Sequence, residues 1–225
     1  MKNYILGLTA LLFLAVGCKD NKKETPQTVA VKELSILDKV ANAHGFENWK
    51  TVSSIKYTFN VDRDSSHFER TWVWEPKTNN VILTTKEDTV RYNRMSMDST
   101  IIKTDGGFIN DKFWLLGPYQ LIWDQHNFTY EHETSSVAPI SKEKMQKLTI
   151  VYGSEGGYTP GDAYDFYFEK DYKIKEWVFR KGNVKEPIMI TSWEDYTNVN
   201  GMYIAQMHKM PESNFKLYFT GIEVR

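Results

Sequence analysis

Apolar and polar residues alternate along most of this chain, and that alternation limits its fold more than any other feature. From Ile55 to Val61 every second residue is apolar and the residues between are polar, which is the pattern of a strand with one buried face. Turn-forming residues, such as those at 159–162 and 181–183, separate many of the later runs. This spacing predicts an antiparallel meander rather than strand–helix–strand units. Strands are expected near residues 55–61, 68–75, 79–86, 89–96, 99–104, 127–132, 147–153, 163–169, 173–181, 187–196, 201–209 and 214–224.

Two segments depart from the alternation. Residues 31–44 have apolar side chains at the spacing of an amphipathic helix, and Gly45 follows as a helix C-cap. In residues 111–125, apolar residues at 113–116 and 121–123 surround a Gly117–Pro118 break, which predicts one or two short helical turns on the apolar face of the sheet. In the last strand the apolar parity switches at Gly221, which predicts a β-bulge.

The N-terminus has the pattern of a bacterial export signal. Lys2 is followed by a nearly unbroken apolar run over residues 4–16. As a helix this run would span roughly 20 Å, less than the hydrocarbon core of about 30 Å, so it indicates a signal peptide rather than a membrane-spanning anchor. Residues 15–18, Ala-Val-Gly-Cys, resemble the lipobox of bacterial lipoproteins, although that pattern prefers Leu where this chain has Ala15. An ordinary secretory signal with an incidental cysteine is the alternative.

The lipobox resemblance implies removal of residues 1–17 as a signal peptide and lipidation of Cys18 with diacylglycerol and palmitate, which would hold the protein on a membrane. Residues 18–30 then form the lipidated cysteine and a polar, flexible tether, and residues 31–225 form a single domain. The implied location is the outer membrane of the cell envelope. The periplasmic face is favoured over the cell surface, because residues 19–21 match only part of a surface-export signal.

The composition and the motifs exclude several kinds of site. The formal net charge is −1 and no basic patch is present, so nucleic acid is not an expected partner. His126 and His132 would lie about 20 Å apart on one strand, too far for one metal ion. Residues 153–156, Gly-Ser-Glu-Gly, lack the spacing of a hydrolase nucleophile elbow. No catalytic residue, metal site or cofactor is therefore predicted, and a hydrolase is the third and least favoured function.

Three segments carry a resemblance to a known family: AHGFENWKTVSSIKYTF (43–59), FWLLGPYQLIWD (113–124) and YTPGDAYDFYFEKDYKIKEWVFRKGN (158–183). With the starting helix that leads into a meander, they resemble a Bacteroidota lipoprotein family within or near the LolA/LolB-like outer-membrane lipoprotein-sorting superfamily. Members tend to have a second Gly where this chain has Phe46. The resemblance covers most of residues 31–225 and bears on fold more than on function.

The resemblance implies a mainly β (α+β) fold, in which a curved antiparallel sheet forms an incomplete (half) β-barrel wrapped around an N-terminal helix and short helical insertions. Known carriers of this fold bind acyl chains on the concave face. The expected function is therefore binding of a lipid or other apolar ligand by a membrane-anchored envelope lipoprotein, without covalent chemistry and without enzyme activity. The alternative is a structural or assembly module with a protein partner in an envelope complex.

The aromatic residues are the candidates for an apolar binding site, since such sites are mostly apolar with a few polar anchors. Packing in the core is the plainer interpretation of the same residues. Arg70 has the same strand parity as Trp72 and Trp74 and is the candidate anchor for an acidic headgroup. The alternative is that Arg70 is a solvated residue at a strand edge. The candidate ligand-binding residues are Trp72, Trp74, Trp114, Trp123, Trp177 and Trp193.

Two short motifs resemble the O-glycosylation acceptor of Bacteroidota proteins. They are Asp88-Thr89-Val90 and Asp98-Ser99-Thr100, with Thr89 and Ser99 as the candidate acceptors. Motifs of three residues also arise by chance, so the intact mass of the native protein is the test.

Overall fold

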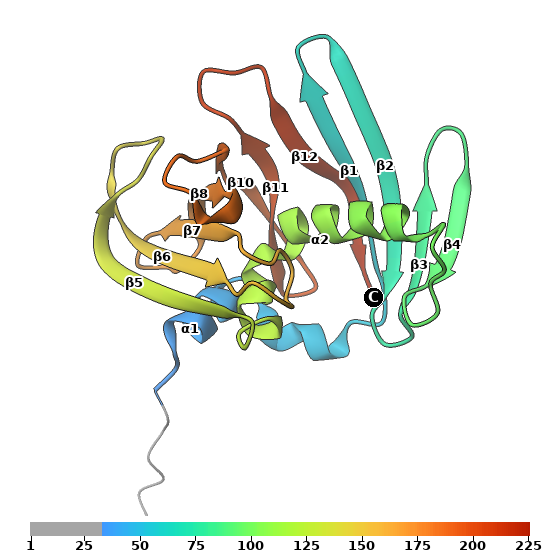
Figure 1. Cartoon of the computed structure of the whole chain (residues 1–225), viewed down its shortest axis with the longest axis horizontal. Helices are drawn as coiled ribbons and strands as arrows, with labels where there is room; N and C mark the ends of the chain where they lie inside the picture. Colours follow the sequence, from blue (N-terminus) through green and yellow to red (C-terminus); the bar gives the residue numbers. More distant parts are fainter. Residues whose placement is uncertain (1–32) are drawn as a thin grey trace, which may run out of the picture. The chain divides into compact units, whose positions relative to one another are not determined.

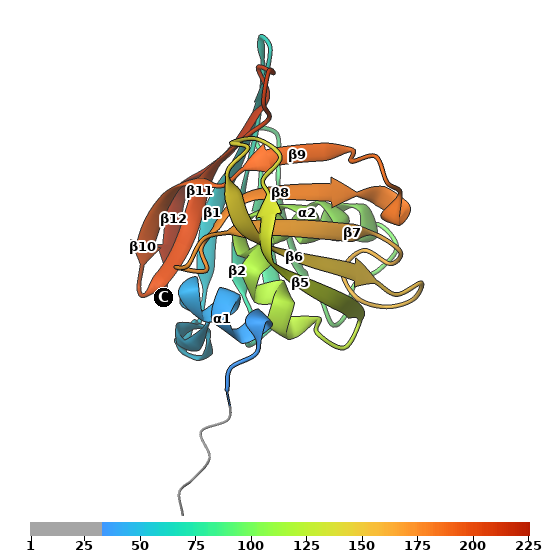
Figure 2. The ribbon, with the colours of Figure 1, turned by 90° about the vertical axis from the view of Figure 1, so that its left-hand side faces the viewer.

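Residues 33–225, the part of the chain that the computed structural model describes, contain two antiparallel sheets and a long helix that crosses between them (Figure 1 and Figure 2). The predicted signal peptide, Cys18 and the tether lie outside these residues. The helices are α1 (Ile36–Ala43) and α2 (Ile102–Trp123), with short 3-10 helices η1 (Phe46–Thr51) and η2 (Lys181–Asn183). The strands are β1 (Ile55–Arg63), β2 (Ser66–Glu75), β3 (Asn80–Thr84), β4 (Thr89–Asn93), β5 (Phe128–Val137), β6 (Lys144–Tyr152), β7 (Ala163–Phe168), β8 (Ile174–Arg180), β9 (Met189–Ser192), β10 (Glu194–Val199), β11 (Met202–Lys209) and β12 (Lys216–Val224).

The seven-stranded sheet has the order β10-β11-β12-β1-β2-β3-β4, so its first strand in the chain pairs with its last. The register between β1 and β12 shifts between Lys56 and Thr58, opposite Gly221, whose φ is +61°. This is the bulge that the parity switch predicts, and glycine suits it because a positive φ is not strained there. The sheets are antiparallel and do not close into a barrel, which confirms the predicted fold class.

The five-stranded sheet follows the chain in the order β5-β6-β7-β8-β9 and is separate from the first sheet. The prediction of one strand over 187–196 is wrong, because the segment divides at Trp193 into β9 and β10, which belong to different sheets. The Trp193 backbone N–H donates to the Lys175 carbonyl at 2.7 Å, and Asp195 has a φ of +55°. The backbone therefore turns from one sheet to the other within a run whose alternation gives no sign of the change.

Helix α2 corrects two further predictions. The predicted strand over 99–104 is wrong, since the chain is helical from Ile102. The short helical turns predicted over 111–125 belong to a longer helical segment, Ile102–Trp123, which is kinked near the predicted break. Its backbone departs from helical angles at Leu116, two residues before Pro118, whose ring and missing N–H disturb the preceding turn. Residues 111–121, in the second half of the helix, are all buried.

Helix α1 is shorter than the predicted segment 31–44, since it begins at Ile36. Ser35 caps it: the Ser35 hydroxyl accepts from the Asp38 N–H at 3.1 Å, and the Asp38 carboxylate accepts from the Ser35 N–H at 3.1 Å. Gly45 has a φ of +82°, the left-handed conformation expected of the residue after a helix. This turn directs the chain through η1 into β1.

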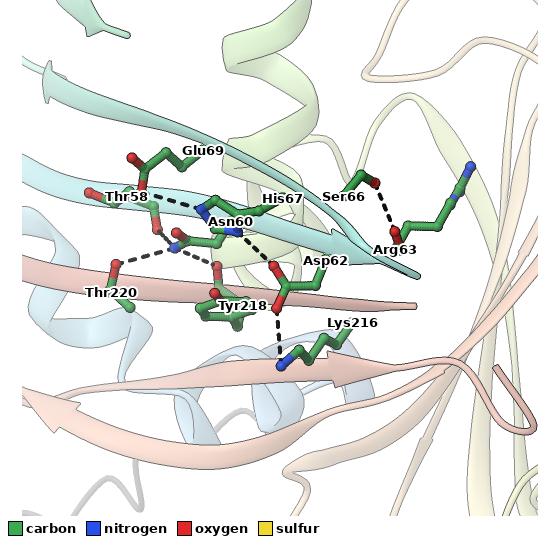
Figure 3. Close-up of polar contacts among 10 residues, drawn as sticks. All are labelled: Thr58, Asn60, Asp62, Arg63, Ser66, His67, Glu69, Lys216, Tyr218 and Thr220. Carbon is green, nitrogen blue, oxygen red and sulfur yellow. Dashed lines mark hydrogen bonds and ion pairs between the residues drawn. The ribbon is translucent and has the colours of Figure 1, made fainter. Parts of the chain in front are cut away.

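The outer face of β1, β2 and β12 is polar, as the alternation predicts (Figure 3). The Asn60 side chain donates to the Tyr218 carbonyl and to the Thr220 hydroxyl, both at 3.2 Å. The Asp62 carboxylate lies 2.6 Å from His67 Nδ1 and 3.0 Å from Lys216 Nζ. The intervening residues of β1 point the other way, into the space that the two sheets and α2 enclose.

Candidate ligand-binding cavity

An apolar cavity of about 300 Å³ lies between the two sheets. Side chains from β1 and β12 form one wall, β7, β8 and β9 form the opposite wall, and α2 contributes a third side. We call it the intersheet cavity. None of the described residues that line it has a charged side chain, and its volume is at the lower end of the roughly 300–1,000 Å³ typical of ligand sites. It is lined by Phe59, Val61, Asn110, Phe113, Trp114, Tyr158, Thr159, Tyr164, Trp177, Phe179, Met189, Phe215 and Leu217.

Aromatic rings form the side of the cavity where α2 meets the five-stranded sheet. The Phe113 ring stacks on Tyr158 with 4.3 Å between centroids, and it lies 4.8 Å from Tyr164. The Trp114 ring packs edge-on against Trp177 at 4.5 Å. Rings that restrain one another in this way hold the wall in place without a ligand, so the cavity is preformed.

The polar groups of the lining are uncharged. Burial raises the pKa of Tyr158 and of Tyr164 well above the ordinary range, so both phenols are neutral at physiological pH. The Tyr164 and Thr159 hydroxyls lie 2.9 Å apart, and Asn110 adds an amide. Activation of a hydroxyl nucleophile needs an adjacent base, and the lining offers none. The cavity is therefore suited to apolar contact and to weak polar contacts.

Two of the six predicted tryptophans, Trp114 and Trp177, line the intersheet cavity. Trp193 is buried and packs edge-on against His208, with 4.7 Å between ring centroids. Trp72 is fully buried, and its Nε1–H donates to the Asp111 carboxylate at 2.8 Å. Trp72 and Trp193 thus belong to the core and do not line this cavity, and a ligand contact by any of the four tryptophans stays a prediction.

The other two predicted tryptophans, Trp74 and Trp123, lie in a separate aromatic group. The Trp49 ring lies 5.3 Å from Trp74 and 4.9 Å from Trp123. Both predicted rings also face the Lys112 ammonium, at 5.3 and 5.5 Å. This group does not line the intersheet cavity.

Arg70, the predicted headgroup anchor, has a partner inside the protein. Its Nε and Nη2 donate to the two carboxylate oxygens of Asp111 at 2.6 and 2.7 Å. Burial raises the pKa of Asp111, and the Arg70 guanidinium and the Trp72 N–H oppose that effect. A headgroup would have to compete with this bidentate pair, so the anchor role of Arg70 stays a prediction.

The remaining predicted sites lie apart from the cavity. Thr89 starts β4 and Ser99 lies in the turn before α2; both are exposed, and their glycosylation stays a prediction. Lipidation of Cys18 concerns a residue that the structure does not describe. Across residues 33–225 no cluster of three or more His, Cys, Asp or Glu side chains is arranged to hold a metal ion. Within the same residues no helix combines the length and apolar character needed to cross a membrane.

Sequence reasoning did not identify most of the cavity lining. Phe59, Val61 and Leu217 do carry a signal, since they have the inward parity of their strands. Tyr158 carries none, because it lies in a glycine-rich turn with no periodicity. A tertiary structure was needed to show that these residues meet.

Solved structures with a similar fold share little sequence with this chain. A LolA superfamily protein from Nitrosomonas europaea aligns with a TM-score of 0.52 and 9% identity, over 84% of this chain and 92% of that chain. A DUF1329 family protein from Desulfovibrio piger gives 0.48 and 9%, over 84% and 91%. An outer membrane lipoprotein-sorting protein domain from Vibrio parahaemolyticus gives 0.47 and 8%, over 83% and 91%. Neither a protein family nor a curated protein matches the sequence.

The chain has a LolA-like fold. The likeness rests on the Nitrosomonas europaea structure and confirms the fold resemblance that the sequence predicts. At 9% identity it shows the fold alone, because proteins of one fold serve many functions. The narrower resemblance to a Bacteroidota lipoprotein family stays a prediction.

Proposed function

We propose that this protein is a membrane-anchored envelope lipoprotein that binds a lipid or another apolar ligand in the intersheet cavity, without covalent chemistry. The observation that carries the proposal is the cavity itself, which is preformed, uncharged and lined mainly by aromatic and aliphatic side chains. Apolar surface that enters it leaves water, which contributes roughly 25 cal/mol per Å². The membrane anchor rests on the lipobox resemblance at Cys18.

The size of the cavity limits the ligand. A volume of about 300 Å³ suits part of one acyl chain rather than a complete lipid with several chains. We therefore expect the rest of a larger lipid to remain outside the cavity. The LolA-like fold supports such a role in the envelope.

Quenching of tryptophan fluorescence by dibromostearate tests the proposal, because bromine quenches an indole only at close range. Trp114 and Trp177 line the cavity, whereas Trp49 does not. We expect saturable quenching of the wild-type protein. Quenching should fall by more than half in the Trp114→Phe/Trp177→Phe double variant and persist in the Trp49→Phe control.

Quenching that is equal in the double variant and the wild type would place the ligand elsewhere. Quenching that is absent altogether, together with no lipid in organic extracts of natively purified protein, would count against lipid binding. Crosslinking in cells would then test the assembly-module alternative, which predicts one dominant protein partner.

A further inference from the structure

A second cavity, of about 240 Å³, lies along α2 and differs from the intersheet cavity in being polar. We call it the Lys112 pocket. Tyr158 lines both cavities, so the two are neighbours. The pocket is lined by Arg94, Ile109, Lys112, Gln120, Asp124, Gly157 and Tyr158.

Lys112 is a buried cation whose ammonium faces three aromatic rings. The residue is 9% exposed, and Nζ lies 5.3 Å from the Trp74 ring centroid, 5.5 Å from Trp123 and 5.9 Å from Phe108. Among residues 33–225 it has no hydrogen-bond or ion-pair partner. Cation–π contact offsets part of the lost hydration, and none of the residues 33–225 accepts a hydrogen bond from the three N–H donors of the ammonium.

Two more donors of the pocket have no acceptor among residues 33–225. Gln120 is 3% exposed, and within the described part of the chain its Nε2 has no hydrogen-bond partner. Arg94 donates from Nε and Nη2 to Asp105 at 2.8 and 3.1 Å, which leaves its Nη1 without a bond to another described residue. The carboxylate of the lining, on Asp124, already accepts from the Tyr152 hydroxyl at 3.2 Å. The lining therefore carries two positive charges, on Arg94 and Lys112, against the single negative charge of Asp124.

We propose that the Lys112 pocket binds a small anionic group, a carboxylate or a phosphate, with Lys112 Nζ and Gln120 Nε2 as donors and Arg94 as a second positive charge. Such a group would form charge-assisted hydrogen bonds and would supply the acceptor that these two donors do not find among residues 33–225. The inference does not require a ligand in the intersheet cavity. A free anion would occupy only the Lys112 pocket. An amphiphile would place its headgroup in the Lys112 pocket and its apolar chain past Tyr158 in the intersheet cavity.

NMR of the Lys112 ε-methylene in purified protein with ¹³C-labelled lysine tests this proposal. Burial, and to a smaller degree Arg94, lower the pKa of Lys112 from 10.5 to about 8, while Asp124 and Asp105 raise it. Tyr158 is neutral and does not oppose an anion. The probes are acetate, inorganic phosphate, decanoate and decyl phosphate. A bound anion should shift the Lys112 signal saturably and return its pKa toward 10.5.

Variants show whether the ammonium does the binding. Lys112→Met keeps an unbranched side chain and removes the charge. Because this variant has no Lys112 signal, its affinity for each anion is measured from the side-chain amide signal of Gln120. We expect affinity to fall at least about tenfold, and to be unchanged in the control Lys103→Met, an exposed lysine of the same helix. If Lys112→Met does not fold, Gln120→Leu, read at Lys112, should show a loss of affinity in the same direction.

The four probes separate the sources of the anion. Binding of acetate or inorganic phosphate indicates a free anion, and binding of decanoate or decyl phosphate alone indicates a lipid headgroup; both support the pocket. No saturable shift with any probe, or an affinity in Lys112→Met within twofold of wild type, would overturn it. Dibromostearate quenching is read at Trp114 and Trp177, so failure of the pocket and failure of the intersheet cavity are distinguishable.

Discussion

Single residues show that the interior of this protein is not simply apolar. Asp105, Asp111, Lys112 and His208 are all buried, although charged or titratable groups are costly to bury unless they are paired or neutral. Asp105 and Asp111 each have an arginine partner. His208 has no ion-pair partner among the described residues, and burial keeps its ring neutral. Each arrangement predicts a different response to substitution.

The Arg70–Asp111 pair should behave as one unit. Asp111 is inaccessible to solvent, so Arg70→Met would leave a buried carboxylate without its cation and should lower the free energy of unfolding by about 3–5 kcal/mol. In a protein that already carries Arg70→Met, the further change Asp111→Asn should lower the free energy of unfolding much less than Asp111→Asn does in the wild type. Urea denaturation of the two single variants and the double variant measures this difference. If Arg70→Met instead keeps full stability and weakens ligand binding, then the headgroup-anchor prediction holds and the structural role fails.

His208 should weaken the fold in acid. Its ring is fully buried against Trp193 and Trp114, and burial lowers its pKa from 6.5 to about 3, although the Ser192 backbone opposes this weakly. The unfolded chain protonates near pH 6.5 while the folded ring stays neutral, so stability falls as pH drops below 6.5. The loss from this ring should reach roughly 2 kcal/mol at pH 5.

His44 adds to the same trend, since burial lowers its pKa to about 4. Urea denaturation gives the decrease in the free energy of unfolding between pH 8 and pH 5. We expect this decrease to be smaller for His208→Phe than for the wild type. His126 is exposed, so His126→Phe serves as the control and should show the same decrease in the free energy of unfolding as the wild type. An equal loss in wild type and His208→Phe would show that the ring is not neutral in the fold.

The parity of Arg70 was enough to predict that it shares a face with Trp72 and Trp74. Its partner was not predictable, because Asp111 lies 41 residues away on a helix that the sequence showed only in part. Lys112 gave no signal at all, since a lysine in an apolar segment reads equally as a solvated residue. Pairing and burial of polar side chains are properties of the tertiary structure.

At the scale of elements, strands were easier to predict than the long helix, and the reason is physical. Strands of these sheets have one polar face, so alternation marks them. Residues 111–121 of α2 are buried on all sides, because sheets cover the helix from two directions. A helix without a polar face has no amphipathic period to detect, and only its apolar content was visible.

The turn between α1 and η1 should tolerate no side chain. A Cβ on Gly45 would lie 2.0 Å from the Gly201 carbonyl oxygen, and the φ of Gly45 is +82°. Gly45→Ala should therefore lower the free energy of unfolding by at least about 2 kcal/mol. The control is Gly106→Ala in α2, where an added Cβ meets nothing within 4 Å.

Gly106→Ala should raise stability by about 0.5–1 kcal/mol, because alanine favours a helix more than glycine does. Thermal unfolding of the two variants checks the pair. A neutral Gly45→Ala would mean that the backbone contact between Gly45 and Gly201 is absent in solution.

At the scale of the whole molecule, the chain forms two sheets around a preformed cavity. The antiparallel class and the open form followed from the alternation and the family resemblance. The division into two sheets at Trp193 did not, since alternation records burial and not the identity of the neighbouring strand. The cavity also could not be located, because its lining comes from six elements and two loops.

Filling the cavity should abolish ligand binding without unfolding the protein. Val61 is half-buried and lines the cavity, so Val61→Trp should occupy much of the space and reduce dibromostearate affinity at least about tenfold. Val73 is also half-buried, but it has the outward parity of β2 and does not line this cavity. Val73→Trp should therefore bind as wild type does, and equal losses in both variants would indicate a general defect.

The most direct test of the account is an NMR measurement of nuclear Overhauser effects between decanoate and the methyl groups of the protein. Val61 and Leu217 face the cavity from one sheet, and Met189 faces it from the other. The account predicts effects from the decanoate methylenes to methyl groups on both sheets at once. Two results would contradict it: nuclear Overhauser effects only to outward-facing methyl groups such as those of Val73, or no such effects at a saturating concentration of decanoate.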